Sequence, residues 1–227
     1  MSFLLPKDST RQEQGLSEHK YTNERVDFNP RSWLSRYRKT SIPYLLKMLL
    51  FYHGIGLLLM TAGTFAVGQL VPGYEEPNII HSLLSVIFAG PTEETLFFGI
   101  PFYLFGSHYA VLITGAIWAT FHVFNTNTLD ISHLAFGNWL FVVPSLFFSL
   151  RTWISGKGWF AIVTHSAWNG IFYMIGCSSG ETRCALLDTG QEMTSLASGV
   201  VVAAALVAIT YMLYKRHEEK ERKRLAA

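Results

Sequence analysis

The sequence predicts an all-α protein: a polytopic transmembrane helix bundle of about six spans around an intramembrane polar cavity. Half of the 227 residues are hydrophobic and only 15% are charged, whereas a soluble domain is about a quarter charged. Lys and Arg gather in the two ends of the chain. Between those ends lie apolar stretches near the roughly 20-residue length of a spanning helix. The net charge of +2 says little by itself, but the gathering of Lys and Arg at the two ends indicates basic cytosolic tails and no nucleic-acid binding.

Six apolar stretches account for the predicted spans: residues 43–71, 78–105, 108–125, 131–150, 159–176 and 196–214. An even number of spans places both termini on one side, which is cytoplasmic because the tails are basic. The connection after the fourth span is then inside and carries Arg151 and Lys157, while the three outside connections carry only Arg183. We therefore expect an integral, multi-pass protein of the cell membrane; an added re-entrant segment would keep the same parity.

The ends of the chain differ from its apolar middle. Residues 1–42 read as a flexible basic cytosolic tail, because they combine charges with few apolar positions. Residues 215–227 form a second charged cytosolic tail, and residues 43–214 form the bundle. The first apolar run is too long for a cleaved signal and predicts an uncleaved anchor. Cys177 and Cys184 share an outside connection, where they form either a disulfide or two free thiols.

The most informative feature is a pair of neighbouring glutamates, Glu93 and Glu94, in the middle of the second apolar stretch. A charged side chain at the bilayer centre costs about 3 kcal/mol on insertion scales, so such residues face a polar cavity or a partner. The two side chains are about 100° apart around a helix. We expect one glutamate to face a shared pocket and the other to orient it.

Three further polar side chains lie within apolar spans: His122, His165 and Asn169. His165 and Asn169 are four residues apart and therefore share one helix face. At about 1.5 Å rise per residue, Glu93, His122 and Asn169 lie roughly 16–21 Å from the cytoplasmic ends of their spans, and His165 roughly 10 Å. These depths predict that the groups meet in one layer.

Such a layer suits hydrolysis of a peptide bond. A carboxylate removed from bulk water is a stronger base, and beside a histidine it binds and deprotonates a water molecule. A second histidine and an amide NH2 then donate hydrogen bonds to the oxyanion that forms when water attacks a carbonyl. Two histidines and a carboxylate could equally hold a divalent metal such as zinc. The sequence does not choose between these two arrangements.

At these residues the chain resembles the CAAX-protease and bacteriocin-processing (Abi) family of intramembrane endopeptidases. That family carries Glu-Glu-x-x-x-Arg, Phe-x-x-x-His and His-x-x-x-Asn motifs on successive membrane helices. Here the first motif starts at Glu93 and has Phe98 in place of the arginine, the second runs from Trp118 to His122, and the third runs from His165 to Asn169. The segment that starts at Leu150 also looks like the family's turn before the third motif. The resemblance covers about residues 83–176, the protease-like core.

The resemblance implies a helical bundle with its active cavity inside the membrane. It makes Glu93 the water-activating base, supported by Glu94, with His122 sharing the water or metal. It makes His165 and Asn169 the oxyanion site. The expected function is intramembrane cleavage of a short peptide or the tail of a membrane-associated protein. Because the family arginine is replaced by Phe98, a non-catalytic scaffold, a peptide-toxin immunity factor or a regulator of the same fold remains an alternative; a proton-relaying transporter is a third.

Overall fold

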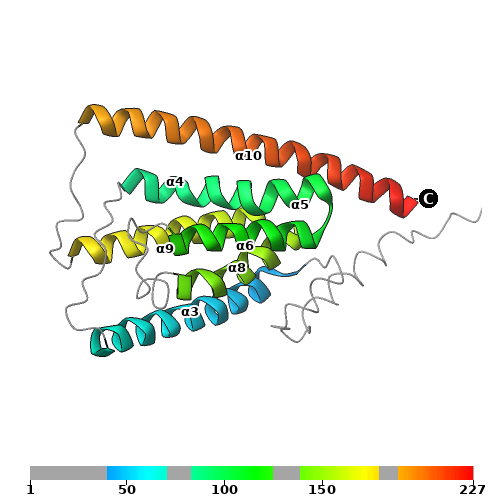
Figure 1. Ribbon diagram of the computed structural model, residues 1–227. Helices are drawn as coiled ribbons and strands as arrows, with labels where there is room; N and C mark the ends of the chain where they lie inside the picture. The colour runs from blue at the N-terminus through cyan, green and yellow to red at the C-terminus, as the bar shows by residue number, and fades with distance from the viewer. Residues whose placement is uncertain (1–39, 71–82, 125–138, 179–188, 227) are drawn as a thin grey trace, which may run out of the picture.

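A computed structural model of the protein describes residues 40–70, 83–124, 139–178 and 189–226 (Figure 1). All regular structure within these ranges is helical. Its elements are α3 (Ile42–Leu70), α4 (Leu83–Glu94), the π-helix η1 (Thr95–Gly99), α5 (Ile100–Phe105), α6 (His108–Phe124), α8 (Trp139–Ile154), α9 (Gly158–Ser178) and α10 (Thr189–Ala226). The predicted tail up to residue 39 and Cys184, one half of the predicted cysteine pair, lie outside the described residues.

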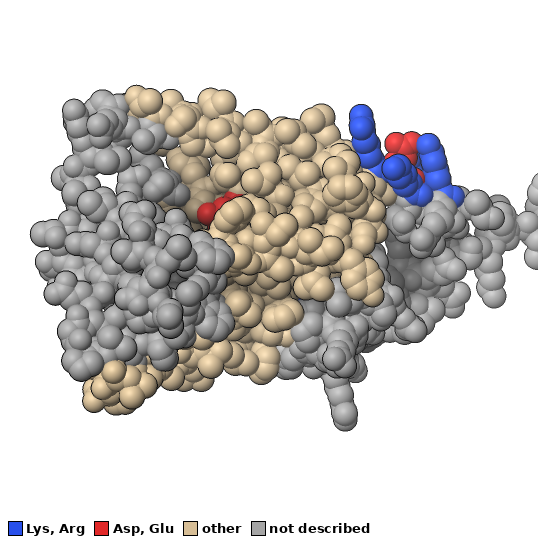
Figure 2. Space-filling view, in the orientation of Figure 1, with Lys and Arg blue, Asp and Glu red and all other residues tan. Residues whose placement is uncertain are grey.

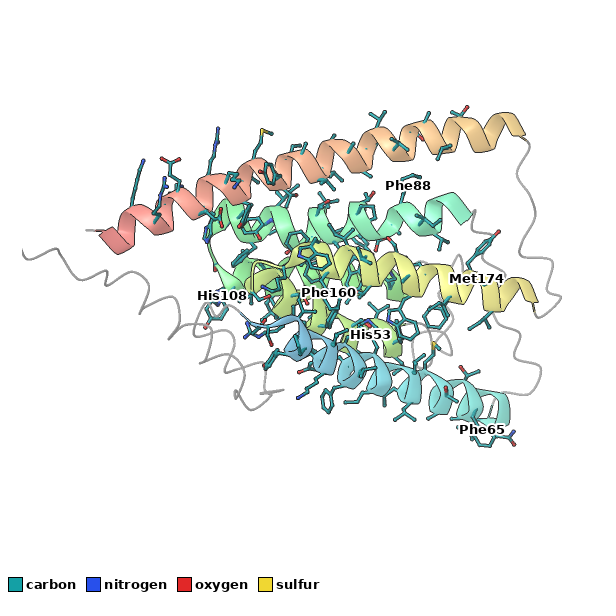
Figure 3. The ribbon with its side chains drawn as sticks, turned by 180° about the vertical axis from the view of Figure 1, so that it is seen from behind. His53, Phe65, Phe88, His108, Phe160 and Met174 are labelled. Atoms are coloured by element: carbon teal, nitrogen blue, oxygen red, sulfur yellow. The ribbon has the colours of Figure 1, made fainter. Side chains whose placement is uncertain are left out.

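The helices form a bundle with the two longest helices on opposite sides (Figure 1). Helix α10 runs along α4 and α5, while α3 packs against α8. Helix α9 packs against α4 and α8, and α6 packs against α8 and η1. Figure 3 shows Phe88 between α4 and α10, where a Cβ on Gly199 would lie only 2.6 Å from the Phe88 ring. The α4–α9 pair therefore contacts α10 through α4 and α8 through α9.

The predicted spans correspond to these helices, with one shift. The fourth predicted span, residues 131–150, corresponds to α8, which is described from Trp139 and extends to Ile154. Arg151, which we placed in an inside connection, therefore lies within α8, where its side chain is buried with the guanidinium 5.5 Å from the centre of the Tyr44 ring. That cation–π contact holds the arginine in the bundle. Lys157 stays in the α8–α9 connection.

Length and composition identify membrane spans for only part of this bundle. Among the described residues, Ile42–Leu70 and Leu196–Lys220 are long and apolar enough to cross a membrane, and Leu140–Ile154 is a shorter apolar helix. An all-helical fold is thus confirmed for the described residues. The arrangement of six membrane spans stays a prediction.

Proline shapes the second predicted span. Pro91 has no N–H to donate to the carbonyl four residues earlier, that of Ile87. The Ser166 hydroxyl of α9 donates to this carbonyl at 2.8 Å. Pro101 likewise leaves the carbonyl of Phe97 without its helical donor, and the Thr114 hydroxyl of α6 donates to it. Neighbouring helices thus satisfy both freed carbonyls, as a low-dielectric interior requires.

Small residues bring α4 and α9 into close contact beside the glutamates. A Cβ on Gly90 would lie 2.1 Å from Ser166 Oγ and 2.9 Å from the Ile162 carbonyl oxygen. No side chain fits there, so glycine allows the two backbones to approach. The same approach brings His165 next to Glu94.

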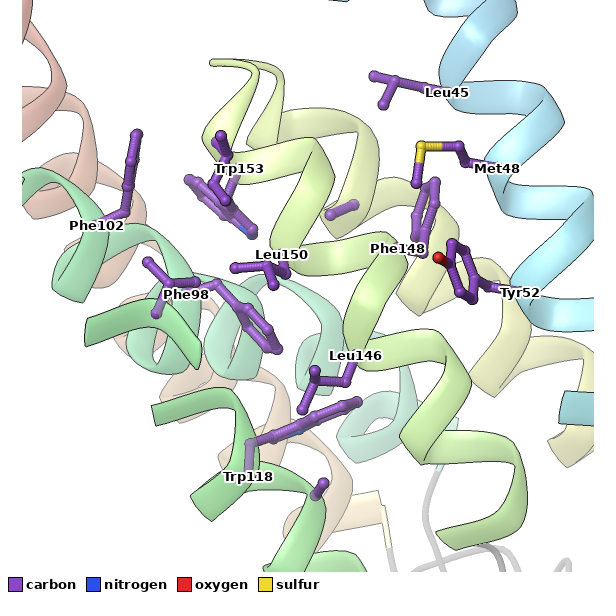
Figure 4. Close-up of a cluster of buried hydrophobic side chains, with 14 of the residues drawn as sticks. Leu45, Met48, Tyr52, Phe98, Phe102, Trp118, Leu146, Phe148, Leu150 and Trp153 are labelled. Atoms are coloured by element: carbon purple, nitrogen blue, oxygen red, sulfur yellow. The ribbon is translucent and has the colours of Figure 1, made fainter. Parts of the chain in front are cut away.

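Aromatic and aliphatic side chains pack together between α8 and its neighbouring helices (Figure 4). Phe98 is fully buried, with its ring centre 5.5 Å from that of Trp118 in an edge-to-face contact. His53 is buried within α3 (Figure 3), and its ring stacks on that of Trp168 of α9 with a distance of 5.5 Å between ring centres. These contacts fix α3, α6, α8 and α9 around the glutamates.

Candidate active site

Glu93 faces a hollow in the bundle. Figure 2 shows acidic atoms at the bottom of this hollow, and among the described residues the other charged atoms visible on this face lie at the charged end of α10. Within the described part of the chain up to Ser178, Glu93 and Glu94 are the only acidic residues. The Glu93 side chain is 29% exposed, whereas Glu94 is buried at 1%. The two neighbouring glutamates therefore occupy different environments.

Three side chains from α6 and α9 surround one oxygen of Glu93. The indole Nε1–H of Trp118 donates to Glu93 Oε2 at 2.6 Å. The Nε2 atoms of His122 and His165 lie 3.8 Å and 3.7 Å from the same oxygen. These two separations are too long for direct hydrogen bonds, but a water molecule can bridge polar groups at such distances.

The backbone sets which nitrogen of His122 carries its proton. Nδ1 lies 2.9 Å from the carbonyl oxygen of Trp118. A carbonyl only accepts hydrogen bonds, so Nδ1 is the protonated nitrogen. In the neutral imidazole, the lone pair is then on Nε2, on the side of Glu93. His122 is thereby oriented to accept a proton from a group held between it and Glu93.

Glu94 is fixed by three donors from two helices. The Ser149 hydroxyl donates to Oε1 at 2.7 Å, and the Trp153 indole N–H donates to Oε2 at 2.8 Å. His165 Nδ1 lies 3.1 Å from Oε1. A buried carboxylate is costly unless such hydrogen bonds are made. The same three contacts hold Glu94 without an arginine at position 98.

His165 lies between the two glutamates. Its Nδ1 faces Glu94 and its Nε2 faces Glu93. The imidazole thus links the buried carboxylate of Glu94 to the partly exposed carboxylate of Glu93. Its ring centre is 5.6 Å from that of Trp118 in an edge-to-face contact, which completes a compact group of side chains.

Asn169 lies one helical turn further along α9. Its amide nitrogen donates to the carbonyl of Val86 on α4 at 3.3 Å. Because an amide nitrogen carries two N–H groups, the second stays available to another acceptor. The structure therefore groups Glu93, Glu94, His122 and His165, and joins Asn169 to the α4 backbone at Val86, seven residues before Glu93. The chemical roles of all five residues stay predictions.

Sequence reasoning missed three residues that contact the glutamates. Trp118 enters the sequence analysis only as the first residue of the second motif, although its indole N–H donates to Glu93. Ser149 and Trp153 are not among the predicted site residues, although both donate to Glu94. Their four-residue spacing, which places them on one helix face, was the signal available in the sequence.

A metal site is the other arrangement that the sequence left open. Among the residues that the structure describes, no three His, Cys, Asp or Glu side chains are arranged to hold a metal ion. The described side chains therefore do not fit a zinc site as they stand. The divalent metal stays a prediction.

Comparison with known families agrees with the resemblance found in the motifs. Residues 75–171 match the family described as type II CAAX prenyl endopeptidase Rce1-like. The matched segment includes all five residues singled out from the sequence. This match confirms the resemblance to the CAAX-protease family. No curated protein and no solved structure matched the chain in parallel comparisons.

Proposed function

We propose that the protein is an intramembrane endopeptidase that hydrolyses a peptide bond in a short peptide or in the tail of a membrane-associated protein. The observation that carries the proposal is the gathering of Trp118, His122 and His165 around Oε2 of Glu93. The family match supports the same class of enzyme. The name of the matched family adds prenylated protein tails as one candidate class of substrate.

The chemistry follows from the geometry of these groups. A water molecule held between Glu93 and His122 transfers one proton to the Glu93 carboxylate, and its oxygen attacks the peptide carbonyl carbon. The resulting oxyanion accepts hydrogen bonds from His165 Nε2–H and from an amide N–H of Asn169. As the C–N bond breaks, protonated Glu93 returns the proton to the leaving amine. The second hydrogen of the water stays on the attacking oxygen, so the products are one carboxylic acid, which then ionises, and one amine.

The proposed setting is a six-span protein of the cell membrane with both termini in the cytoplasm. Two candidate spans and the basic ends of the chain support it. The long helix α10 changes from apolar to charged near Lys215. There the ammonium of Lys215 lies 5.6 Å and 5.7 Å from the ring centres of Tyr211 and Tyr214. Aromatic and basic side chains at such a boundary are typical of a cytoplasmic interface.

The non-catalytic alternative rested on the missing arginine. That argument weakens because Glu94 receives three donors from other residues. A direct test compares purified wild-type protein with Glu93→Gln, His122→Ala and His165→Ala in proteoliposomes that contain a peptide reporter library. We expect cleavage by the wild type only. Cleavage that survives all three changes would overturn the assignment, and a function retained by Glu93→Gln would favour a binding or immunity role.

A further inference from the structure

The hydrogen bonds around Glu94 bear on which ring nitrogens of His165 carry a proton. His165 Nδ1 faces a carboxylate that is 1% exposed, so this nitrogen carries a proton. A neutral imidazole has only one N–H. If that proton is on Nδ1, then Nε2 has a lone pair and cannot donate to an oxyanion. His165 can serve as an oxyanion donor only when both nitrogens are protonated.

An imidazolium in an apolar bundle needs a nearby negative charge. Glu94 supplies it, provided that its carboxylate stays ionised and in place. Two neutral donors from α8 stabilise the ionised form: the Ser149 hydroxyl bonds one oxygen and the Trp153 indole bonds the other. Hydrogen bonds to a charged acceptor are stronger than those between neutral groups. Both donors are themselves buried.

Packing also holds the Trp153 indole in place. The Trp153 ring lies against Gly99 and Gly158, where an added Cβ would lie 2.6 Å and 2.2 Å from ring atoms. Figure 4 shows Trp153 projecting from α8 toward the helix that carries Phe98. Phe98 has no polar atom and is buried. The position of the family arginine is thus apolar here, and the contacts to Glu94 come from a different helix.

We propose that Ser149 and Trp153 are positioning residues that hold Glu94 as the counter-ion of a doubly protonated His165, in place of a cationic side chain at position 98. This inference rests on the proposed function for its catalytic meaning. Its structural content, the protonation of His165 through Glu94, is independent of cleavage. The two parts can be tested separately.

The kinetic test removes one donor at a time. Ser149→Ala and Trp153→Phe are expected to lower kcat on the order of tenfold, since each removes a hydrogen bond to a charged group. KM should change less than about twofold, because neither residue touches the substrate. The matched control is Ser145→Ala on the same helix. Ser145 is also buried, but its hydroxyl bonds the Phe141 carbonyl. Equal kcat values for Ser149→Ala and Ser145→Ala would overturn the proposal.

The second test needs no substrate. In protein labelled with ¹⁵N-histidine, the His165 signals are identified by their loss in His165→Gln. Both ring nitrogens should resonate as protonated in wild type and in Ser145→Ala, and Nε2 should lose its proton in Ser149→Ala or Trp153→Phe. An unchanged His165 spectrum in folded Ser149→Ala and Trp153→Phe would overturn the proposal. If the wild type cleaves no peptide, the proposed function fails while this measurement still decides the role of Ser149 and Trp153.

Discussion

The indole N–H of Trp118 donates a 2.6 Å hydrogen bond to Oε2 of Glu93. The bond joins the second and third predicted spans at the residue assigned as the base. It also uses a tryptophan where the resembling family has phenylalanine. The substitution adds a polar contact that a phenylalanine ring cannot make.

Replacing this donor tests its contribution. Trp118→Phe keeps an aromatic ring against Phe98 but removes the N–H. We expect kcat to fall roughly tenfold, because Glu93 loses a charge-assisted hydrogen bond. The control is Trp159→Phe, since Trp159 is 57% exposed. Turnover of a cleaved reporter in both variants provides the measurement, and equal turnover would show that only ring volume matters at position 118.

Loss of the His122 imidazole should have a larger effect. His122→Ala removes the group that shares the water with Glu93, so we expect kcat to fall about a hundredfold or more. Thr120→Ala is the control, because the Thr120 hydroxyl is exposed and bonds only within α6, at 2.8 Å to the Ala116 carbonyl. Comparable rates in the two variants would remove His122 from the mechanism.

The close approach of α4 and α9 predicts a stability effect. Gly90→Ala places a Cβ within 2.9 Å of the backbone of Ile162 and Ser166, so the helices must move apart. We expect the free energy of unfolding to fall by about 1–3 kcal/mol. Gly54→Ala on α3 is the control, because nothing lies within 4 Å of its added Cβ. Thermal unfolding in detergent measures both, and a Gly90→Ala protein as stable as its control would contradict the packing.

Ser166→Ala tests the bond to the carbonyl freed by Pro91. The change leaves the Ile87 carbonyl without the hydroxyl that donates to it, which should lower the free energy of unfolding by about 1 kcal/mol. Thr164→Ala serves as the control, since its hydroxyl bonds carbonyls of its own helix at 2.8 Å and 3.0 Å. Denaturation of both proteins in detergent is the readout, and identical midpoints would make the bond irrelevant to stability.

Metal removal tests the arrangement of the site. The mechanism that we propose activates water with Glu93 and uses no metal, so it predicts that cleavage persists after treatment with a chelator and exhaustive dialysis. Metal analysis of the same sample should find less than one zinc per chain. Activity that is lost on chelation and restored by added zinc would instead establish a metal-dependent enzyme.

Much of the fold follows from hydrophobic patterning. Most helix positions could be predicted because long apolar stretches alternate with short polar connections. It misplaced the end of α8, since Arg151 reads as a loop residue until its contact with Tyr44 is known. A buried cation depends on a partner from another helix, and local sequence does not contain that information.

The candidate site was predictable only in part, for a related reason. Charged and imidazole side chains are rare in spanning helices, so the sequence alone identified Glu93, Glu94, His122 and His165 as candidate site residues. Trp118, Ser149 and Trp153 are common in such helices, where tryptophan and serine usually need no special explanation. Their role depends on which atom they face, and that is set by the packing of α6 and α8 against η1.

The π-helix Thr95–Gly99 separates the glutamates from the segment that follows them. Its wider turn, closed by the Ile100 N–H to the Thr95 carbonyl, accommodates one residue more than an α-helical turn. Deleting a residue there would turn α5 by about 100° relative to the carboxylates. The aromatic side chains Phe102 and Tyr103, which contact α10 at His217, would then lose their alignment. This short stretch thus sets the rotation of α5, and of its contacts with α10, relative to the two glutamates.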